Sequence, residues 1–493
     1  MIGGAAVPAG WVRRLRWAAL PAAAGLVAGL LAACAALPQG GPVRVGREGA
    51  LEEEPYIRAV AAGPAEGASL DQIVEGFLQA MLAGATDDFK VARSYLAADI
   101  ASVWDPSASV TVYQSGEAPV LAQSGTQLGR MTLTVNQVGS VDAAGRHSPG
   151  PLGAKTFTLH LSQGEDSEWR ISELPDGTII PEDVFRVDYL ATPIHFPSAD
   201  GQFLVPDRRV FPRQSAATDA AREFLAGPPP YLTGATQAVV PTGTKLATES
   251  VKVADGVATV NLNEAASRAS ETARAAMLAC LAATLTHLPD IRSVELRLEG
   301  AELAVPGSGG LNADPPGAAG PFYLGDGGVW LFDGAARAVA GTEAATTWSS
   351  LSVDHSAKRF AGLAGGGFQV LQEPSGEVVE WKLPDGAAPT APPSFDRLGS
   401  LWVAAGPTVA AFNSDGDIGV LGAPWLEGSQ VVALAPSRDG ARLALALDAG
   451  GGAVRLVVTG IVRGDGGLPW RLTGPLEVGL VASPVTSLSW CDG

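Results

Sequence analysis

Cys34 is the residue of this chain whose reactivity stands out most from its surroundings. The sequence holds three cysteines, Cys34, Cys280 and Cys491, which are too few for a disulfide framework. Cys34 follows Ala32 and Ala33 at the end of an apolar run. A thiolate is a good nucleophile, and small neighbouring side chains let a peptidase approach the backbone. The Cys34 sulfur is therefore a candidate for covalent modification at a place where the backbone is accessible to a peptidase.

The residues before Cys34 have the pattern of a secretory signal. Arg13, Arg14 and Arg16 form a positive stretch, and residues 17–31 are apolar. A helix of about 15 residues at ~1.5 Å each reaches about 22 Å, which is short of a ~30 Å hydrocarbon core. The length and the positive flank therefore predict a signal peptide over residues 1–33.

The four residues Leu31, Ala32, Ala33 and Cys34 resemble the lipobox of bacterial lipoproteins. In that motif a diacylglycerol is attached to the cysteine and the chain is cut before it. The resemblance implies S-diacylglycerol and N-palmitoyl groups on Cys34. Proline and glycine are frequent just after Cys34, as in a flexible tether, so residues 34–68 are interpreted as a lipidated tether. An ordinary signal peptide with an incidental cysteine is the alternative.

The charge of the chain argues against two kinds of partner. The formal net charge is −18 at pH 7, whereas nucleic-acid-binding surfaces are basic and anionic lipid attracts positive charge. Membrane attachment would therefore depend on the lipid chains at Cys34, and stable anchoring takes more than one chain. After residue 34 the sequence has no uninterrupted apolar run of about 18 residues that would span a membrane.

The remaining reactive side chains form no recognisable catalytic or metal-binding motif. The five histidines lack HxxH or HExxH spacing, which a zinc site would favour. The nucleophile-elbow and phosphate-loop motifs are also absent from the sequence. Residues 413–419, NSDGDIG, suggest a calcium loop only superficially, because they lack its alternating carboxylates and distant glutamate. We therefore predict no enzyme activity, no cofactor and no metal, and a polar turn at 413–419.

Hydrophobic periodicity predicts a first α+β domain over residues 69–195. Residues 69–84 place their apolar side chains on one helical face, with Ser69 and Gln72 as a capping box and Gly84 as the expected end. A second helix is expected over 88–98. Strand patterns follow at 110–113, 131–138, 157–162 and 169–172. Helices followed by an antiparallel sheet indicate an α+β fold, and a cone-shaped fold of the nuclear-transport-factor type is one candidate.

A second α+β domain is predicted over residues 196–310. Residues 251–263 alternate on both sides of Asp255-Gly256, which is typical of a hairpin. Thr218 is expected to cap a helix that ends before the GPPP stretch at 227–230. A further helix carries Cys280 on its apolar face, which predicts a small core side chain. Pairing of Cys280 with Cys491 stays open.

The third region, residues 315–493, is predicted to be an all-β propeller-like domain. A weak repeat at 351–364, 393–404, 433–447 and 487–493 places Asp354, Asp396 and Pro436 in like positions. Its period of about 40 residues is typical of four-stranded propeller blades. The last repeat breaks off after one strand. We therefore expect a truncated, incomplete propeller, an arc of about three blades, with Cys491 on an unpaired strand. Unrelated hairpins in a sandwich are the alternative.

The order of these features resembles the LpqB lipoproteins of actinobacteria. The resemblance rests on the lipobox, the GFLQAM and ARSYL helical stretch, the WRISELPDG stretch at 169–177, a middle part similar to a GerMN domain, and a propeller. It implies a lipid-anchored protein on the outer face of the cell membrane. It also implies an accessory role to the MtrAB two-component system through the extracytoplasmic domain of the sensor histidine kinase MtrB, with effects on cell-wall homeostasis and division. The family contributes no catalytic motif, only the lipidated Cys34.

A tethered binder of cell-wall glycan or another small ligand is the second hypothesis, and an envelope hydrolase is the least favoured. Glycan sites stack sugar rings on exposed aromatic side chains. Seven tryptophans lie in the third region: Trp330, Trp348, Trp381, Trp402, Trp425, Trp470 and Trp490. Most are expected to pack between strands, which favours the interaction protein over the glycan binder.

Overall fold

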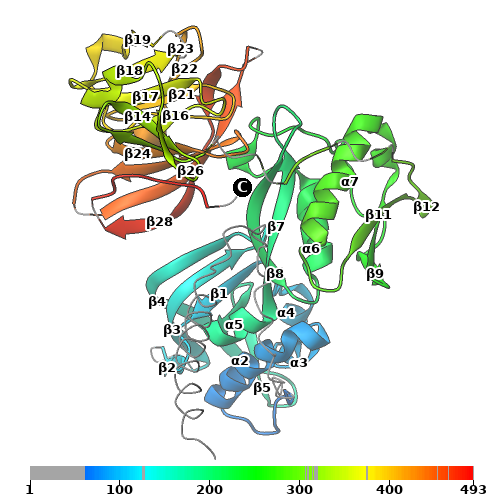
Figure 1. Cartoon of the computed structure of the whole chain (residues 1–493). Helices are drawn as coiled ribbons and strands as arrows, with labels where there is room; N and C mark the ends of the chain where they lie inside the picture. Colours follow the sequence, from blue (N-terminus) through cyan, green and yellow to red (C-terminus); the bar gives the residue numbers. More distant parts are fainter. Residues whose placement is uncertain are drawn as a thin grey trace, which may run out of the picture. The chain divides into compact units, whose positions relative to one another are not determined.

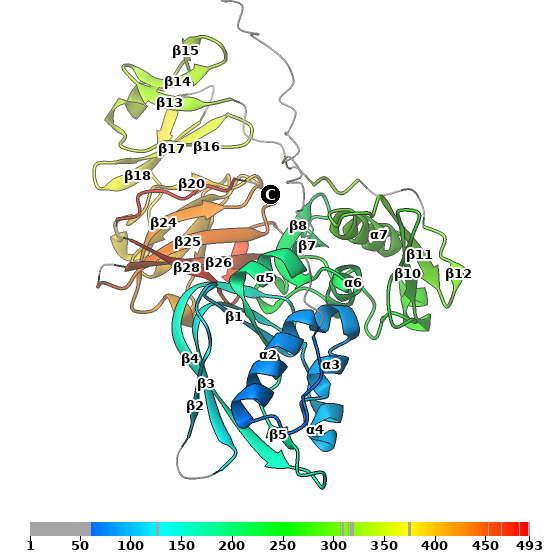
Figure 2. The same cartoon turned by 90° about the horizontal axis from the view of Figure 1, so that it is seen from below.

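The computed structural model describes residues 61–491 except 125–127, 306, 308–309, 314, 316–319, 373–375, 452, 465 and 483. The expected signal peptide and most of the expected tether lie outside the described residues. The chain continues from two regions of mixed helices and strands into a region of small sheets (Figures 1 and 2). Within the described residues, every helix is too short or too polar to cross a membrane.

The first region consists of helices on a twisted sheet. Its elements are α2 (Leu70–Asp87), α3 (Lys90–Arg93), α4 (Ala98–Val103), β1 (Ser109–Tyr113), β2 (Val120–Gln123), β3 (Arg130–Asp142), β4 (His147–Gln163), β5 (Trp169–Glu173) and β6 (Thr178–Pro181). The strand order is β5-β4-β3-β1-β6, and β2 pairs with β3. The apolar face of α2 packs on the sheet, with Phe77 among Met131, Leu133 and Ile171 in one buried cluster. The expected strands are present. The prediction of an antiparallel sheet is wrong at one edge, where β1 and β6 pair in parallel.

The ends of the first helices differ from the prediction in two places. The capping box of Ser69 and Gln72 is confirmed. Helix α2 does not end at Gly84 but continues to Asp87, and its left-handed cap falls at Asp88. Gly84 lies inside the helix, where a Cβ would overlap the Phe89 ring that packs over it. The expected helix 88–98 is interrupted because Leu96 bridges to Ile171 of β5.

The second region joins a long hairpin to an α/β unit. Its elements are α5 (Glu182–Asp188), β7 (Tyr189–Pro197), β8 (Leu204–Pro212), α6 (Ala216–Ala226), η1 (Pro230–Leu232), β9 (Lys252–Ala254), β10 (Val257–Leu262), η2 (Glu264–Arg268), α7 (Glu271–Leu285), β11 (Ser293–Leu298) and β12 (Ala301–Glu302). Strands β7 and β8 pair with each other, and the other strands form a sheet in the order β12-β11-β10-β9. Helix α6 begins after Ser215 rather than at Thr218, because the Thr218 hydroxyl accepts a hydrogen bond from the Val251 amide instead of capping.

The cysteines of the described residues are both free. Cys280 is fully buried in the core of the second region, and burial raises the pKa of its thiol far above the ordinary value. Cys491 is exposed and forms no disulfide with it. The prediction of Cys280 as a small core side chain is confirmed.

The third region contains four small sheets within the described residues. The sheets comprise β13 (Phe322–Gly325), β14 (Gly328–Phe332) and β15 (Ala336–Ala338); β16 (Ser352–Val353), β17 (Arg359–Ala364), β18 (Gly367–Gln372) and β19 (Glu377–Val379); β20 (Ser394–Phe395), β21 (Leu401–Ala405), β22 (Thr408–Phe412) and β23 (Ile418–Leu421); and β24 (Gln430–Pro436), β25 (Arg442–Asp448), β26 (Ala453–Arg463), β27 (Pro469–Leu472) and β28 (Leu476–Ala482). Figure 2 shows them in succession. Two α+β regions followed by a propeller-like β region confirm the predicted fold class.

The repeat is confirmed, but its register and count need correction. The turn after the first strand of a sheet closes with a backbone hydrogen bond from Asp354 to Arg359 (3.0 Å), from Asp396 to Ser400 (2.9 Å) and from Ser437 to Arg442 (2.8 Å). Ser437 therefore takes the position assigned to Pro436, since proline has no N–H to donate. The sheet β13–β15 carries none of the sequence repeat, so the expected arc of about three blades was one sheet too small.

Candidate functional site

The residues predicted to carry lipid lie outside the described residues. Leu31, Ala32, Ala33 and Cys34 all fall within 1–60, so their role stays a prediction. In the part of the chain that the structure describes, no three His, Cys, Asp or Glu side chains gather in a way that could hold a metal ion. Two other features have the geometry of functional elements: a buried polar network in the third region and a cleft in the second.

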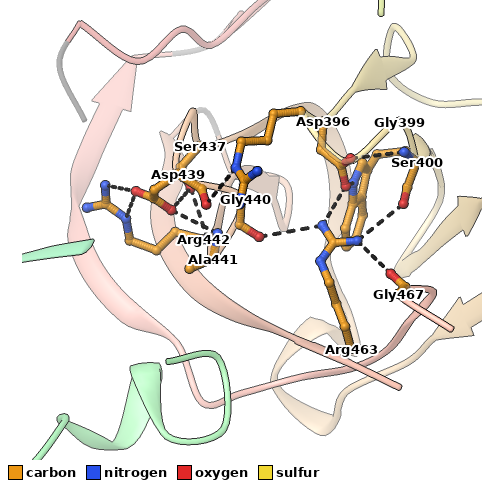
Figure 3. A network of polar contacts seen from close by, with 12 residues as sticks. Asp396, Gly399, Ser400, Ser437, Asp439, Gly440, Ala441, Arg442, Arg463 and Gly467 are labelled. Atoms are coloured by element: carbon orange, nitrogen blue, oxygen red, sulfur yellow. Dashed lines mark hydrogen bonds and ion pairs between the residues drawn. The ribbon is translucent and has the colours of Figure 1, made fainter. Parts of the chain in front are cut away.

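Asp396 is the centre of the first half of the polar network (Figure 3). It lies in the turn between β20 and β21, and its carboxylate accepts hydrogen bonds from the Ser400 amide at 2.9 Å and the Trp402 indole at 2.8 Å. Arg463, at the end of β26, places Nη2 2.6 Å from the same carboxylate. Arg463 also donates to the Ser400 hydroxyl at 3.2 Å. The last sheet is thereby connected to the turn of the preceding sheet.

Asp439 is the centre of the second half, in the equivalent turn between β24 and β25. Its carboxylate accepts from the Ser437 hydroxyl at 2.5 Å and from Nε and Nη2 of Arg442 at 3.1 and 2.5 Å. Gly440 lies between the two ion pairs (Figure 3), and its carbonyl accepts from Arg463 at 3.5 Å. All four charged side chains are buried, so their charges are compensated by each other rather than by water.

Residues of the polar network and its flanking turns also contact the second region. Arg442 donates from Nη1 to the Pro206 carbonyl at 3.0 Å. Arg397 pairs with Asp200, and its guanidinium lies 4.4 Å from the centre of the Phe203 ring. These contacts connect the turns of the third region to the β7–β8 hairpin. Because hydrogen bonds and ion pairs occupy the carboxylates of Asp396 and Asp439, neither is free to act as a base.

A cleft of about 760 Å³ lies in the second region beside the last turn of α6. Its apolar lining includes Phe196 and Phe224, whose rings stack with centroids 5.9 Å apart. The opposite wall is formed by residues 237–246. Ligand pockets of ~300–1,000 Å³ with apolar linings and a few polar groups are common in proteins, so this cleft has the dimensions of a binding site.

The charged residues at the cleft are held in different ways. Glu223 lines the cleft, and Nη1 of Arg209 lies 3.1 Å from its carboxylate. Burial raises the pKa of Glu223, and the nearby Arg209 opposes that rise. Arg209 itself is only 2% exposed and also pairs with Asp207 at 2.5 Å. Lys245, on the opposite wall, is exposed and forms no ion pair within the described residues.

Sequence reasoning missed both features. The ion pair of Asp396 and Arg463 joins residues far apart in sequence, and the cleft combines a strand end, a helix end and a coil segment. The aspartate that recurs in the turns of the sequence repeat was the signal available for the polar network. The tryptophans largely follow the prediction: Trp348 and Trp402 are buried, whereas Trp470 is 57% exposed.

Three family models match successive parts of the chain. "Lipoprotein LpqB, N-terminal domain" matches residues 63–186, and "Lipoprotein LpqB beta-propeller domain" matches residues 327–493. The chain belongs to the LpqB lipoprotein family. Between the two, "Sporulation and spore germination" matches residues 193–304, which include the cleft. The LpqB family is not known for enzyme activity.

Proteins named lipoprotein LpqB from three actinobacteria resemble this LpqB-family chain. The Thermobifida fusca protein is 29% identical over 94% of this chain and 84% of its own length. The Streptomyces coelicolor protein is 29% identical over 89% of this chain and 78% of its own length. The Cutibacterium acnes protein is 34% identical over 60% of this chain, but the match spans only 48% of that relative. The shared name, lipoprotein, implies lipid anchoring.

Proposed function

We propose that this LpqB-family protein is an extracytoplasmic modulator, anchored to the cell membrane by lipid on Cys34, of the MtrAB two-component system. In this proposal it contacts the outer domain of the sensor kinase MtrB and thereby affects cell-wall homeostasis and division. The observation that carries the proposal is the match of both LpqB models to the chain, together with the lipobox that ends at Cys34.

The anchor and the compact regions support function by contact. A lipid anchor would confine the protein to the membrane surface where a kinase displays its outer domain, which raises the effective concentration of the two partners. The buried pair of Asp439 and Arg442 connects the third region to the β7–β8 hairpin through the Pro206 carbonyl, which supports a fixed relative geometry. A fixed geometry lowers the entropic cost of binding a partner.

Crosslinking in cells tests the proposed contact. A photoreactive amino acid placed at exposed positions of each region, such as Val103, Val253 and Ile418, should yield a crosslink to MtrB from at least one region. Phosphorylation of MtrA should change when the gene is deleted. Unchanged MtrA phosphorylation together with no crosslink from any region would overturn the proposal, and a site on the fully buried Ile73 provides the negative control.

A glycan-binding function is the second candidate, and the exposure of Trp470 favours it. Arg471 lies 5.3 Å from the Trp470 ring centre, and an aromatic face beside a cation can hold a sugar ring and its polar groups. Chitooligosaccharides should then quench tryptophan fluorescence in the parent protein but not in Trp470→Ala. Equal quenching in both proteins would exclude Trp470 as the platform.

A further inference from the structure

We propose that the cleft beside α6 binds an extended peptide strand that carries apolar side chains and a carboxylate. The partner is defined by this chemistry and not by the identity of the kinase, so the inference is independent of the function proposed above. It rests on three properties of the cleft: its apolar lining, an unpaired stretch of backbone and an uncompensated cation.

The apolar lining provides the space for side chains. Phe224 is fully buried, and Leu225 is buried beside it. Val239, Val240 and Leu246 on the opposite wall are only half-buried, so a ligand that covers them would remove further apolar surface from water. Burial of that kind favours binding and offsets part of the cost of association.

The wall at residues 238–240 has main-chain groups without partners. The segment is anchored on one side by the Gln237 amide, which donates to the Pro197 carbonyl at 2.9 Å, and on the other by a turn from Pro241 to Thr244. Between these points, the backbone N–H and C=O groups of Ala238, Val239 and Val240 form no hydrogen bond with the described residues. Residues 238–240 are coil that ends in a bend at Val240 and are not part of a sheet, so these N–H and C=O groups offer individual hydrogen bonds to the main chain of a bound peptide.

Thr244 adds a polar group with the same property. It lines the cleft and is 4% exposed, and its hydroxyl has no hydrogen-bond partner among the residues that the structure describes. A buried hydroxyl without a partner costs free energy, so the wall of the empty cleft keeps one polar group whose hydrogen bond is not formed. A ligand main chain could supply the missing partner after a small side-chain adjustment.

Lys245 determines which peptide is favoured. Arg222 at the rim is already paired with Asp219 at 3.4 Å, and Glu223 is already paired with Arg209. Lys245 is the exposed charge of the cleft that lacks an ion pair among the described residues. A carboxylate on the ligand complements this cation, whereas a lysine at the same place would be repelled.

Binding to synthetic peptides tests the inference on the full chain purified in detergent. The probe is a fluorescein-labelled peptide of alternating glutamate and valine, followed by fluorescence anisotropy. The comparison peptides replace glutamate by glutamine or carry N-methyl groups on alternate amides, which removes main-chain donors. The protein variants are Lys245→Glu and, as a matched charge change on the exposed face of β9 outside the cleft, Lys252→Glu.

The acidic peptide should bind in the micromolar range and lose about tenfold in affinity with Lys245→Glu, with glutamine in place of glutamate, and with N-methylation. Lys252→Glu should bind like the parent, and both variants should have the parent melting temperature. No binding up to about 1 mM peptide, or equal affinity for the N-methylated peptide, would overturn the inference. Displacement by N-acetylglucosamine tetrasaccharide without any effect of Lys245→Glu would assign the cleft to glycan and overturn it as well.

Discussion

Arg463 and Asp396 form a buried ion pair between two successive sheets, with Nη2 and Oδ2 2.6 Å apart. The arginine side chain is 7% exposed and the carboxylate is 0% exposed. The pair connects the end of β26 to the turn before β21, so the contact is made between sheets and not within one. Removal of either partner leaves the other as an uncompensated buried charge, which is strongly destabilising.

Asp396→Asn should therefore lower the free energy of unfolding by about 3 kcal/mol. The amide keeps the shape of the carboxylate but cannot neutralise Arg463. Thermal unfolding followed by circular dichroism measures the effect. Asp415→Asn, an exposed change in the turn between β22 and β23, is the control and should melt like the parent. Equal melting temperatures for the two variants would show that the ion pair does not stabilise the region.

His195 should make the protein less stable in mild acid. Its Nδ1 lies 3.3 Å from the Thr284 hydroxyl, and burial, with smaller effects of His287 and Arg442, lowers the pKa of His195 to about 4. The unfolded chain has a histidine pKa of about 6.5, so it binds the proton more tightly than the folded state does. Stability is therefore complete above about pH 6.5 and falls by about 2–3 kcal/mol as the pH approaches 4.

The matched variants for this prediction are His195→Gln and His355→Gln. The melting temperature of His195→Gln should decrease less between pH 7 and about pH 4.5 than that of the parent, because glutamine does not titrate. His355 is exposed, so its variant should follow the parent. An identical decrease in all three proteins would assign the acid sensitivity to other groups.

Gly84→Ala should destabilise the protein although it lies inside a helix. Alanine is about 1 kcal/mol better than glycine in a helix interior. A Cβ at position 84, however, would overlap the ring of Phe89, which packs edge-on against Trp104 with centroids 5.8 Å apart. Overpacking typically costs about 1–3 kcal/mol, so the net change should be a lower melting temperature. The double variant Gly84→Ala, Phe89→Leu should recover part of the loss; a more stable Gly84→Ala protein would contradict the overlap.

Cys34→Ser should abolish incorporation of labelled fatty acid and leave an unprocessed or released protein, since the serine hydroxyl does not replace the thiolate as acceptor. Metabolic labelling followed by cell fractionation measures both effects. Cys491→Ser, at an exposed cysteine, is the matched control and should remain labelled. Continued labelling of Cys34→Ser would show that the lipobox interpretation is wrong.

The features predicted from sequence are those encoded by neighbouring residues. The capping box of Ser69 and Gln72 requires only a local spacing, and the hairpin at Asp255-Gly256 requires two residues that accept positive φ, here 51° and 76°. The fully buried Cys280 follows from the period of its helix. Each of these signals is contained within one element.

The features that sequence reasoning missed depend on contacts between distant segments. The parallel pairing of β1 with β6 and the ion pair of Asp396 with Arg463 are set by tertiary packing. Helix propensity could not locate the break at Leu96, because a bridge to β5 competes with the helix there. The cleft likewise needs the end of β7, the end of α6 and residues 237–246 together, and no local pattern marks that convergence.

The second and third regions share one apolar core, and this restricts how the gene can recombine. Ala441 belongs to the same buried cluster as Phe224 and Leu281, and the Thr473 hydroxyl donates to the Tyr231 carbonyl at 2.5 Å. In a hybrid, the spore-germination-type domain would come from one relative and the β-rich domain from another. The side chains at the contact between the two domains must then fit each other, because a mismatch leaves cavities and unpaired polar groups. We therefore expect these two domains to be exchanged between relatives together and not separately.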